Sequence, residues 1–398
     1  MKTDVMLTYG WVRSTYAALM NFKNHQINVS IGDCSKIGMS QWSRFRTNNF
    51  FYTDPIQNKD AFLNELNYLI KKEKPVMLLP SHDETEIIAS ESEFISKYTL
   101  LPIPSIDQLR LANNKSETQE FAQKIGVRTP RRFYYSQPKD ILGLIPNECK
   151  SVIRLRKGNS AKGVFYACGT QKTYDLLCQI IEKYKCDEDR YPVVQQYVSG
   201  EGWGVSCLYW EGERIAHFTH RRIREKTVTG GTSTLREHQP NEQLEAFAFS
   251  LLDKLQWHGL AMVEFKYDPL TEKGYFIEIN PRLWGSIHLA ISAGVEFPYL
   301  LYLCATKGKN STLSYFSNCK IKYPWRSRWY LGDCILAFQN LLNFNFRDGI
   351  RYLLPGETDT YDDFNIKDPL AFVGEVCYYG MNFLRNRSIN PVKNGMIG

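Results

Sequence analysis

The segment Gly274–Ser286, with the sequence GYFIEINPRLWGS, carries a carboxylate, a carboxamide and a guanidinium at close spacing. Its first half alternates β-branched and aromatic residues, which predicts a strand. Glu278 and Asn280 then share one face of that strand with Phe276. Their side-chain oxygens suit a hard cation such as Mg²⁺, and Arg282 beyond the strand could reach a phosphate or acyl-phosphate oxygen. For this segment alone, an edge strand with solvated polar residues is the alternative.

A second predicted strand, Leu260–Tyr267, precedes this one and ends at a turn-forming Asp-Pro pair. A hairpin register that places Glu264 opposite Glu278 also places Tyr267 opposite Tyr275. Carboxylates this close repel each other, so a divalent cation is the expected occupant of the space between them. Because Mg²⁺ binds one or two carboxylates together with substrate phosphates, the hairpin predicts a nucleotide site.

With Glu264 followed by FIEINPR at 276–282, the sequence resembles the ATP-grasp ligases. This superfamily includes biotin carboxylase, carbamoyl-phosphate synthetase and D-alanine–D-alanine ligase. The resemblance extends over roughly residues 1–305 and is greatest to the branch of carboxylate–amine ligases and predicted carboligases. It implies that Glu264, Glu278 and Asn280 hold one or two Mg²⁺ ions, with Mn²⁺ as a substitute, and that Arg282 stabilises the transferred phosphoryl group.

Length and composition agree with a globular protein of two or three domains. The chain has 398 residues, of which 43% are hydrophobic and 23% charged. A net charge of +7 suits anionic small molecules as well as nucleic acid, so it decides little. Ten scattered cysteines without a CxxC pair favour reduced thiols in a cytoplasmic protein. The first residues lack the apolar core of a signal peptide, and no apolar run is long enough to span a bilayer.

Residues 1–112 alternate predicted strands and helices, which indicates a small doubly wound parallel sheet. Ligands of such sheets bind beyond the carboxyl ends of the strands. Those ends carry Tyr9 with Arg13 and Ser14, and the run Ser81–Glu84. For that run, a helix N-terminus with acids in its first turn is the alternative. By resemblance, this is the pre-ATP-grasp domain that helps to form the acceptor site.

Residues 113–306 are the expected ATP-grasp domain, with a lid subdomain at about 150–198. A helix over Asn113–Ile125 is predicted, with Asn113 or Asn114 as N-cap. In the family this helix carries a basic residue that contacts ATP, usually after an Asp, and Lys115 takes its place here. An ordinary exposed lysine is the alternative reading.

The lid should begin with a strand, a glycine-containing loop and a second strand over Ser151–Gly169. The family usually has a lysine on the first strand, where this chain has Arg154. A further strand over Pro192–Val198 resembles the hinge that reads adenine through backbone groups, with Gln195 where an acid is common. The resemblance assigns the following residues to the nucleotide: Lys115, Arg154, Ser160, Lys162, Gln195, Gln196, Tyr197, Val198 and, for the ribose, Glu201.

A basic stretch, HRRIREKTVTGGTSTLRE, follows a predicted hairpin around Glu211-Gly212. Arg221, Arg222, Arg224 and Lys226 precede a Gly-Gly-Thr-Ser segment that resembles the basic loop of the predicted carboligases. Such a loop can close cations over phosphates, and one or more of the three arginines should stabilise the acyl phosphate. An RNA-binding loop is the rival, but no aromatic ladder is interleaved with it, so no nucleic-acid partner is expected.

Residues 307–398 carry no family motif and are expected to form a C-terminal extension of packing helices and irregular structure. The resemblance implies an α/β fold class, α+β in the grasp region, with the ATP-grasp fold and its antiparallel central sheet. The aromatic segment from Trp325 to Trp329 predicts a packed cluster, with a partner or membrane-surface contact as the alternative.

The resemblance implies an ATP-dependent carboxylate–amine ligase that works through an acyl phosphate and releases ADP and phosphate. A carboxylase acting through carboxyphosphate and a degenerate ATP-binding regulator are the rivals. Arg154 in place of Lys and Gln195 in place of Glu invite the regulator, whereas the complete set of acids, Asn280 and Arg282 argues against it. Amino acids, peptides and amino-sugar precursors are candidate substrates, no residue chooses among them, and a homodimer is an open expectation.

Overall fold

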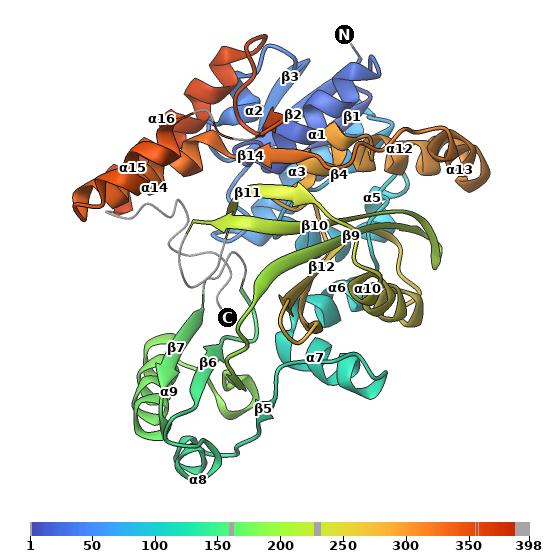
Figure 1. Cartoon of the computed structure of the whole chain (residues 1–398). Coiled ribbons are helices and arrows are strands. Elements are labelled where there is room, and N and C mark those ends of the chain that lie inside the picture. Colours follow the sequence, from blue (N-terminus) through green and yellow to red (C-terminus); the bar gives the residue numbers. More distant parts are fainter. Residues whose placement is uncertain (1, 159–162, 227–231, 355, 357, 387–398) are drawn as a thin grey trace.

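The computed structural model describes residues 2–158, 163–226, 232–354, 356 and 358–386. Ser160, Lys162 and residues 227–231 of the basic stretch lie outside the described residues. Within the described ranges the strands form three sheets of four, seven and four strands (Figure 1). In the same ranges no single helix has the length and apolarity to cross a membrane. One bent pair of helices, Ile287–Ala293 with Phe297–Lys307, meets that criterion by length and composition.

The N-terminal sheet is parallel, with the strand order β3-β2-β1-β4. Val5 and Leu7 of β1 pack in one apolar cluster with helix α1, whereas Met6 packs in another with α3, so helices cover both faces. The doubly wound arrangement predicted for this part follows from these uninterrupted apolar strands. The elements are β1 (Val5–Leu7), α1 (Arg13–Asn24), β2 (Val29–Asp33), α2 (Met39–Trp42), β3 (Asn48–Phe51), α3 (Lys59–Glu73), β4 (Met77–Leu79), α4 (Glu84–Ala89), α5 (Ser92–Ile95) and α6 (Ile106–Asn113).

The central sheet has the order β13-β12-β9-β10-β11-β14-β15 and is antiparallel except for its last pair. One face packs against helices α7 and α10, and the other packs against α1, α11 and α12. The elements are α7 (Lys115–Lys124), β9 (Glu201–Trp210), β10 (Glu213–Glu225), β11 (Ser233–His238), α10 (Glu242–Lys254), β12 (Gly259–Asp268), β13 (Lys273–Asn280), α11 (Ile287–Ala293), α12 (Phe297–Lys307), α13 (Lys309–Ser317), β14 (Arg326–Arg328) and β15 (Thr360–Tyr361).

The third sheet, with the order β5-β8-β6-β7, lies at the lower left of Figure 1, below the central sheet. Its core joins Ile153 and Val194 of the sheet to Ile141, Leu177 and Ile180 of two helices. The elements are β5 (Arg132–Phe133), the short 3₁₀ helix η1 (Pro138–Asp140), α8 (Ile141–Leu144), β6 (Lys150–Arg154), β7 (Val164–Cys168), α9 (Thr170–Tyr184), the 3₁₀ helix η2 (Glu188–Arg190) and β8 (Val193–Gln196).

Residues beyond 306 are mostly helical and irregular where the structure describes them, as predicted, but they also contain two short strands that the sequence did not predict. Strands β14 and β15 extend the central sheet, and three helices follow or flank them: α14 (Tyr330–Leu342), α15 (Phe346–Leu353) and α16 (Pro369–Asn386). These strands were missed because each has only two or three residues and carries polar side chains. Arg328 and Asp362 are nevertheless almost fully buried, and Trp329 belongs to the packed interior.

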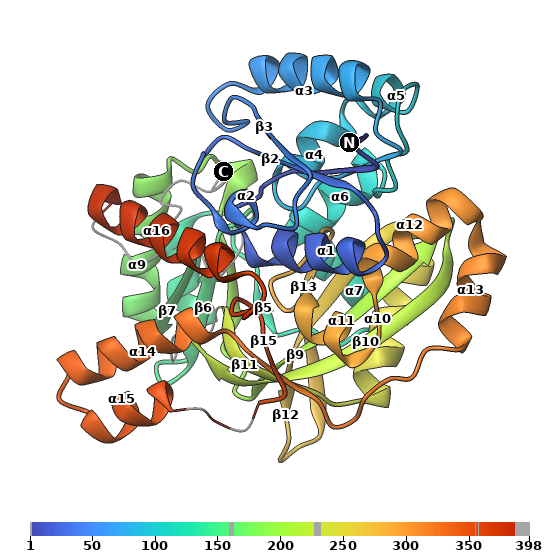
Figure 2. The ribbon, with the colours of Figure 1, turned by 90° about the horizontal axis from the view of Figure 1, so that it is seen from above.

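Helix α16 lies against α2 of the N-terminal part (Figure 2). The contact is close at Gly374, where a Cβ would come within 2.5 Å of the Gly38 carbonyl oxygen. Trp11 stacks on Tyr378 with ring centroids 4.5 Å apart. These contacts fix the C-terminal helix over the loops that follow the parallel strands.

Candidate functional site

A cavity of about 520 Å³ lies where the three sheets meet. This volume is in the range of small-molecule sites. One end is lined by lid residues, including Arg154 and Gln196–Val198, and the middle by the β12–β13 pair. The other end is lined by loops of the N-terminal part and by the C-terminal segment, including Arg13 and Glu375.

The two acids at the centre come from neighbouring strands, as the sequence predicts. Glu264 on β12 pairs with Glu278 on β13. The register then shifts at a β-bulge, so that Tyr267 is opposite Gly274 and not opposite Tyr275. A bulge inserts one unpaired residue into a strand, so the side chains before the bulge lie on the face opposite to the one that regular alternation predicts.

The bulge also corrects the predicted facing of Phe276. This side chain is 1% exposed and packs with Ile279 in the apolar cluster beneath the sheet, whereas Glu278 and Asn280 line the cavity. Strict alternation had placed Phe276 beside Glu278. Residue Ile277, which lies between the two registers, also lines the cavity.

Glu278 is held by two cations. Its Oε2 is 2.6 Å from Arg154 Nη2 and 3.6 Å from Lys115 Nζ. Burial alone would raise the pKa of Glu278, but Lys115, Arg154 and Arg282 together hold that pKa below its usual value. Burial lowers the pKa of Lys115, and the neighbouring guanidinium groups lower it further. Arg154 therefore reaches the central acid from strand β6 of the third sheet.

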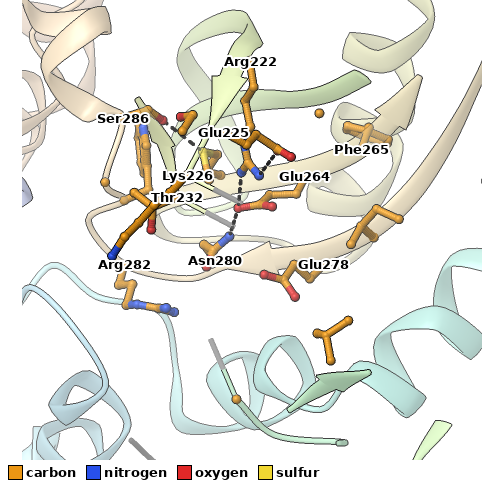
Figure 3. A pocket seen from close by; sticks show the side chains of 18 of the residues that line it. Arg222, Glu225, Lys226, Thr232, Glu264, Phe265, Glu278, Asn280, Arg282 and Ser286 are labelled. Carbon is orange, nitrogen blue, oxygen red and sulfur yellow. Dashed lines mark hydrogen bonds and ion pairs between the residues drawn. The ribbon is translucent and has the colours of Figure 1, made fainter. Parts of the chain in front are cut away.

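Glu264 has a different environment (Figure 3). Its Oε1 is 2.7 Å from Arg222 Nη2 and accepts a hydrogen bond of 2.9 Å from Asn280 Nδ2. Burial raises the pKa of Glu264 and the charge of Glu278 adds to this, although Arg222 opposes it. Figure 3 shows Arg222 also directed at Glu225, at a distance of 3.4 Å.

Of the three arginines predicted to act on the acyl phosphate, Arg222 belongs to the described lining of the cavity and the other two do not. Arg221 pairs with Glu237 on the neighbouring strand β11, at 2.8 Å. Arg224 would share the face of Arg222 on a regular strand, but a register shift between them directs it to Asp333, at 2.5 Å. Alternation and bulging on β10 thus separate this cluster.

The lid and hinge place most of the predicted nucleotide residues in the cavity. Lys115, Arg154, Gln195, Gln196, Tyr197 and Val198 line it. The Gln195 side chain donates to Gln119 Oε1 of α7, at 2.6 Å, so its amide is already hydrogen-bonded. Glu201 is not part of the described lining, and its carboxylate accepts from Trp203 Nε1 at 3.3 Å. Its predicted contact with ribose stays a prediction.

The N-terminal strand ends contribute as expected, through Tyr9, Arg13, Ser14, His82 and Asp83. Glu84 instead has the structural role that was the alternative. It is 1% exposed, and its Oε1 accepts from the backbone amides of Ser81 and His82 at the start of α4. Arg282 lines the cavity with its Nε 3.9 Å from Asp83 Oδ1, which joins the N-terminal part to the central sheet.

Sequence reasoning missed the residues that the C-terminal segment brings to the cavity, namely Trp329, Glu375 and Tyr379. Glu375 had a usable signal, because it is the one charged residue in the otherwise apolar stretch 369–379. Lys226 also lines the cavity, and burial followed by repulsion from Arg13 lowers the pKa of Lys226 to about 8.

The central donors can be tested against the expected metal ion. Two carboxylates and an amide supply oxygen atoms, which suit Mg²⁺ or Mn²⁺. No group of three or more His, Cys, Asp or Glu side chains fit to hold a metal occurs among the described residues. Two carboxylates and an amide are a donor set that fits a cation bound jointly by the protein and by substrate phosphates.

Comparisons with known proteins identify similar sequences and similar folds. A family model described as "ATP-grasp in the biosynthetic pathway with Ter operon" matches residues 188–323. Carbamoyl-phosphate synthase of Methanobrevibacter smithii is 21% identical over 211 residues, which cover 51% of this chain and 55% of that protein. The chain therefore spans little more than half the length of this curated relative.

Similar solved structures include biotin carboxylase from Campylobacter jejuni, described as a β,γ-ATP complex. Its TM-score is 0.64 and its identity 13%, over 82% of this chain and 74% of that chain. An L-amino acid ligase from Bacillus licheniformis has a TM-score of 0.58 and 12% identity, over 77% of this chain and 74% of that chain. These matches confirm the ATP-grasp resemblance and the mixed α/β fold that the motifs predicted.

Proposed function

Because this chain has the ATP-grasp fold, we propose that it is an ATP-dependent ligase that joins a carboxylate to an amine. The observation that carries the proposal is the charge arrangement at the centre of the cavity. Glu264 and Glu278 lie on paired strands, and each is held by a cation from another element, Arg222 and Arg154 respectively. Such an arrangement can exchange its protein ion pairs for contacts with phosphates.

ATP would enter with its adenine at the hinge. Gln196, Tyr197 and Val198 line the cavity at its lid end, and their backbone groups could read a purine without a specific side chain. The phosphates would extend toward Lys115 and Arg154, whose charges presently meet at Glu278. Mg²⁺ or Mn²⁺ would be held by Glu264, Glu278 and Asn280 and would neutralise charge on the phosphates.

The proposed reaction has two steps, and the remaining cations of the cavity would stabilise the intermediate between them. A substrate carboxylate oxygen attacks the γ-phosphorus, the bond to the β–γ bridging oxygen breaks, and ADP leaves. The product is an acyl phosphate, whose negative charge Arg222 and Arg282 would stabilise. An amine then attacks the acyl carbon, the carbon–oxygen bond to phosphate breaks, and an amide and phosphate result. The protein supplies position and charge and does not form a covalent intermediate.

ADP release by the purified protein with Mg-ATP tests this proposal. Pools of amino acids, other small carboxylates and amines are added singly and in pairs. We expect release that needs both a carboxylate and an amine and that is lost in Glu278→Gln and Arg282→Ala. Release that needs only bicarbonate would replace the ligase with a carboxylase. ATP binding by calorimetry without turnover in any pool would favour a regulatory protein.

A further inference from the structure

The end of the cavity remote from the lid is closed by a carboxyl group on the C-terminal helix. Glu375 is 1% exposed and lines the cavity, together with Tyr379 one turn later on α16. Ala371 and Gly374 are buried on the same side of the helix, whereas Val373 and Val376 are exposed. A charged residue therefore stands on the inward, apolar face of α16, where its burial requires compensation.

That compensation is incomplete. Glu375 Oε1 accepts a hydrogen bond from Trp329 Nε1, at 3.1 Å, and is 3.8 Å from Arg13 Nε. Among the described residues, no hydrogen bond reaches the second oxygen, Oε2. A buried oxygen without a partner is costly, so a hydrogen-bond donor from a ligand would be favourable here.

The groups around Glu375 favour the proton-bound form of its carboxyl group. Burial raises the pKa of Glu375 well above its usual value, and the charges of Asp363 and Asp362 raise it further. Arg13 and the Trp329 hydrogen bond act in the opposite direction. Arg13 is itself paired with Asp362, at 2.5 Å, so much of its charge is already neutralised.

Two aromatic rings complete this end of the cavity. Lys226 Nζ lies 5.8 Å from the ring centroid of Trp329 and 5.9 Å from that of Tyr379. The side-chain nitrogen of Lys226 therefore lies at the outer limit of a cation–π contact with both rings. They also offer apolar surface to the body of a ligand.

Resting on the ligase function proposed above, we propose that Glu375 contacts the attacking amine and takes up its proton, with Trp329 and Tyr379 as the walls of the amine subsite. The substrate class is a primary amine with an apolar or planar body beside the nitrogen. The carboxylate substrate belongs nearer to Arg222 and Arg282, because a second carboxylate beside Glu375 would be repelled.

The proton balance of the step is complete. The substrate ammonium gives one proton to the Glu375 carboxylate and becomes a neutral amine. Its lone pair forms the bond to the acyl carbon, and the electron pair of the broken carbon–oxygen bond leaves on phosphate. The nitrogen loses a second proton to that phosphate, which departs as hydrogenphosphate. Glu375 returns its proton to solvent when the amide leaves.

Hydroxylamine separates the two half-reactions and is the probe for the test. It is uncharged at neutral pH, so it traps an acyl phosphate as a hydroxamate without needing a protein base. Native protein is first screened with Mg-ATP, hydroxylamine and carboxylate pools, and the active carboxylate is then paired with ordinary amines. The variant is Glu375→Gln, whose amide oxygen can still accept from Trp329 but whose side chain cannot take up a proton.

We expect Glu375→Gln to form hydroxamate within about threefold of the native rate and to form amide about 100-fold more slowly. Below the pKa of the amine, amide formation by the variant should rise about tenfold per pH unit, because only amine deprotonated in solution can react, while the native dependence is shallower. Gly380→Ala, on the same helix with open space around it, is the matched control and should match native protein in both assays.

The outcomes separate the two proposals. No hydroxamate from native protein with any carboxylate would overturn the ligase function and this inference with it. Hydroxamate and amide formation that fall together in Glu375→Gln, with a lowered melting temperature, would make Glu375 a structural residue and overturn the inference alone. Amide formation at the native rate and with the native pH profile would also overturn it.

Discussion

Glu264 and Glu278 are directly opposed on the paired strands β12 and β13, yet their pKa values are displaced in opposite directions. Burial acts on both carboxyl groups in the same sense. At Glu278 the charges of Lys115, Arg154 and Arg282 outweigh it and lower the pKa, whereas at Glu264 burial and the neighbouring charge prevail over Arg222. Two chemically identical side chains are therefore distinguished by the elements that approach them, α7 and the lid at one, β10 at the other.

Glu278→Gln should lower ADP release about 100-fold or more, because the ionised carboxylate that meets both phosphate-side cations is lost. Glu201→Gln is the control, since its carboxylate lies at Trp203 outside the described lining of the cavity. Its rate should stay within about threefold of native. A comparable loss in both variants would show that Glu201 does contact the nucleotide.

Substitutions of two neighbouring arginines on β10 should have very different effects on ADP release. Arg222→Met should lower ADP release about 100-fold, because it removes a cavity cation and leaves the partly buried Glu264 without its closest charge partner. Arg221→Met removes a half-exposed partner of Glu237 and should change the free energy of unfolding by at most about 1 kcal/mol and the rate little. Steady-state kinetics of the two variants measure the rate of ADP release, and denaturant titrations measure the free energy of unfolding. Equal losses of activity would contradict the placement of Arg222, and not of Arg221, in the described lining of the cavity.

Acid should weaken the join between the N-terminal and C-terminal segments at Asp362. Burial opposes ionisation of Asp362, but Arg236 and Arg13 lower its pKa from 3.8 to about 2. Since the folded value is the lower one, the stabilisation is fully present above pH 3.8 and is lost as the pH falls through 2. It amounts to about 2 kcal/mol.

Asp362→Asn tests that linkage. At neutral pH the variant should lose about 3–5 kcal/mol of unfolding free energy, because Arg236 is then buried without its counter-charge. Denaturant titrations between pH 7 and 3 should show the difference from native protein narrowing toward low pH. A difference that stays constant with pH would mean that the ion pair is not its source.

Gly374→Ala should displace helix α16 from α2, because its methyl group would meet the Gly38 carbonyl oxygen at 2.5 Å. We expect a loss of about 1–3 kcal/mol in unfolding free energy and a parallel loss of amide formation as Glu375 moves. Gly380→Ala on the same helix meets no atom within 4 Å and should stabilise the protein by about 0.5–1 kcal/mol. Thermal and denaturant unfolding distinguish the pair, and equal effects would argue against the close α2–α16 contact.

Features that depend on neighbours in the sequence could be predicted. Asn114 caps α7, accepting from the amides of Ser116 and Glu117, because an N-cap is decided within one turn. The opposition of Glu264 and Glu278 followed from a short connection between two strongly patterned strands. The carboxyl ends of the parallel strands were expected at a ligand site because of a rule of topology, and Arg13 and His82 line the cavity.

Features that depend on the third dimension could not be predicted from the sequence. The residue types do not indicate the β-bulge that places the Phe276 side chain in the core. Nor do they indicate the register shift on β10 that directs Arg224 to Asp333 and away from the cavity. Alternation assumes a regular strand, and both sites depart from it by one residue.

The sequence by itself determined the strand pair with its two acids, because periodicity and short connections act locally. The fold class and the cations expected near the acids, Lys115 and Arg154, came from the resemblance to the ATP-grasp family. Only the tertiary structure decided which cations face the cavity and that Glu375, more than ninety residues after Asn280, closes its far end. The reason is physical: β14, β15 and α16 are held by buried ion pairs and by one close glycine contact, whose partners lie more than a hundred residues away in the chain.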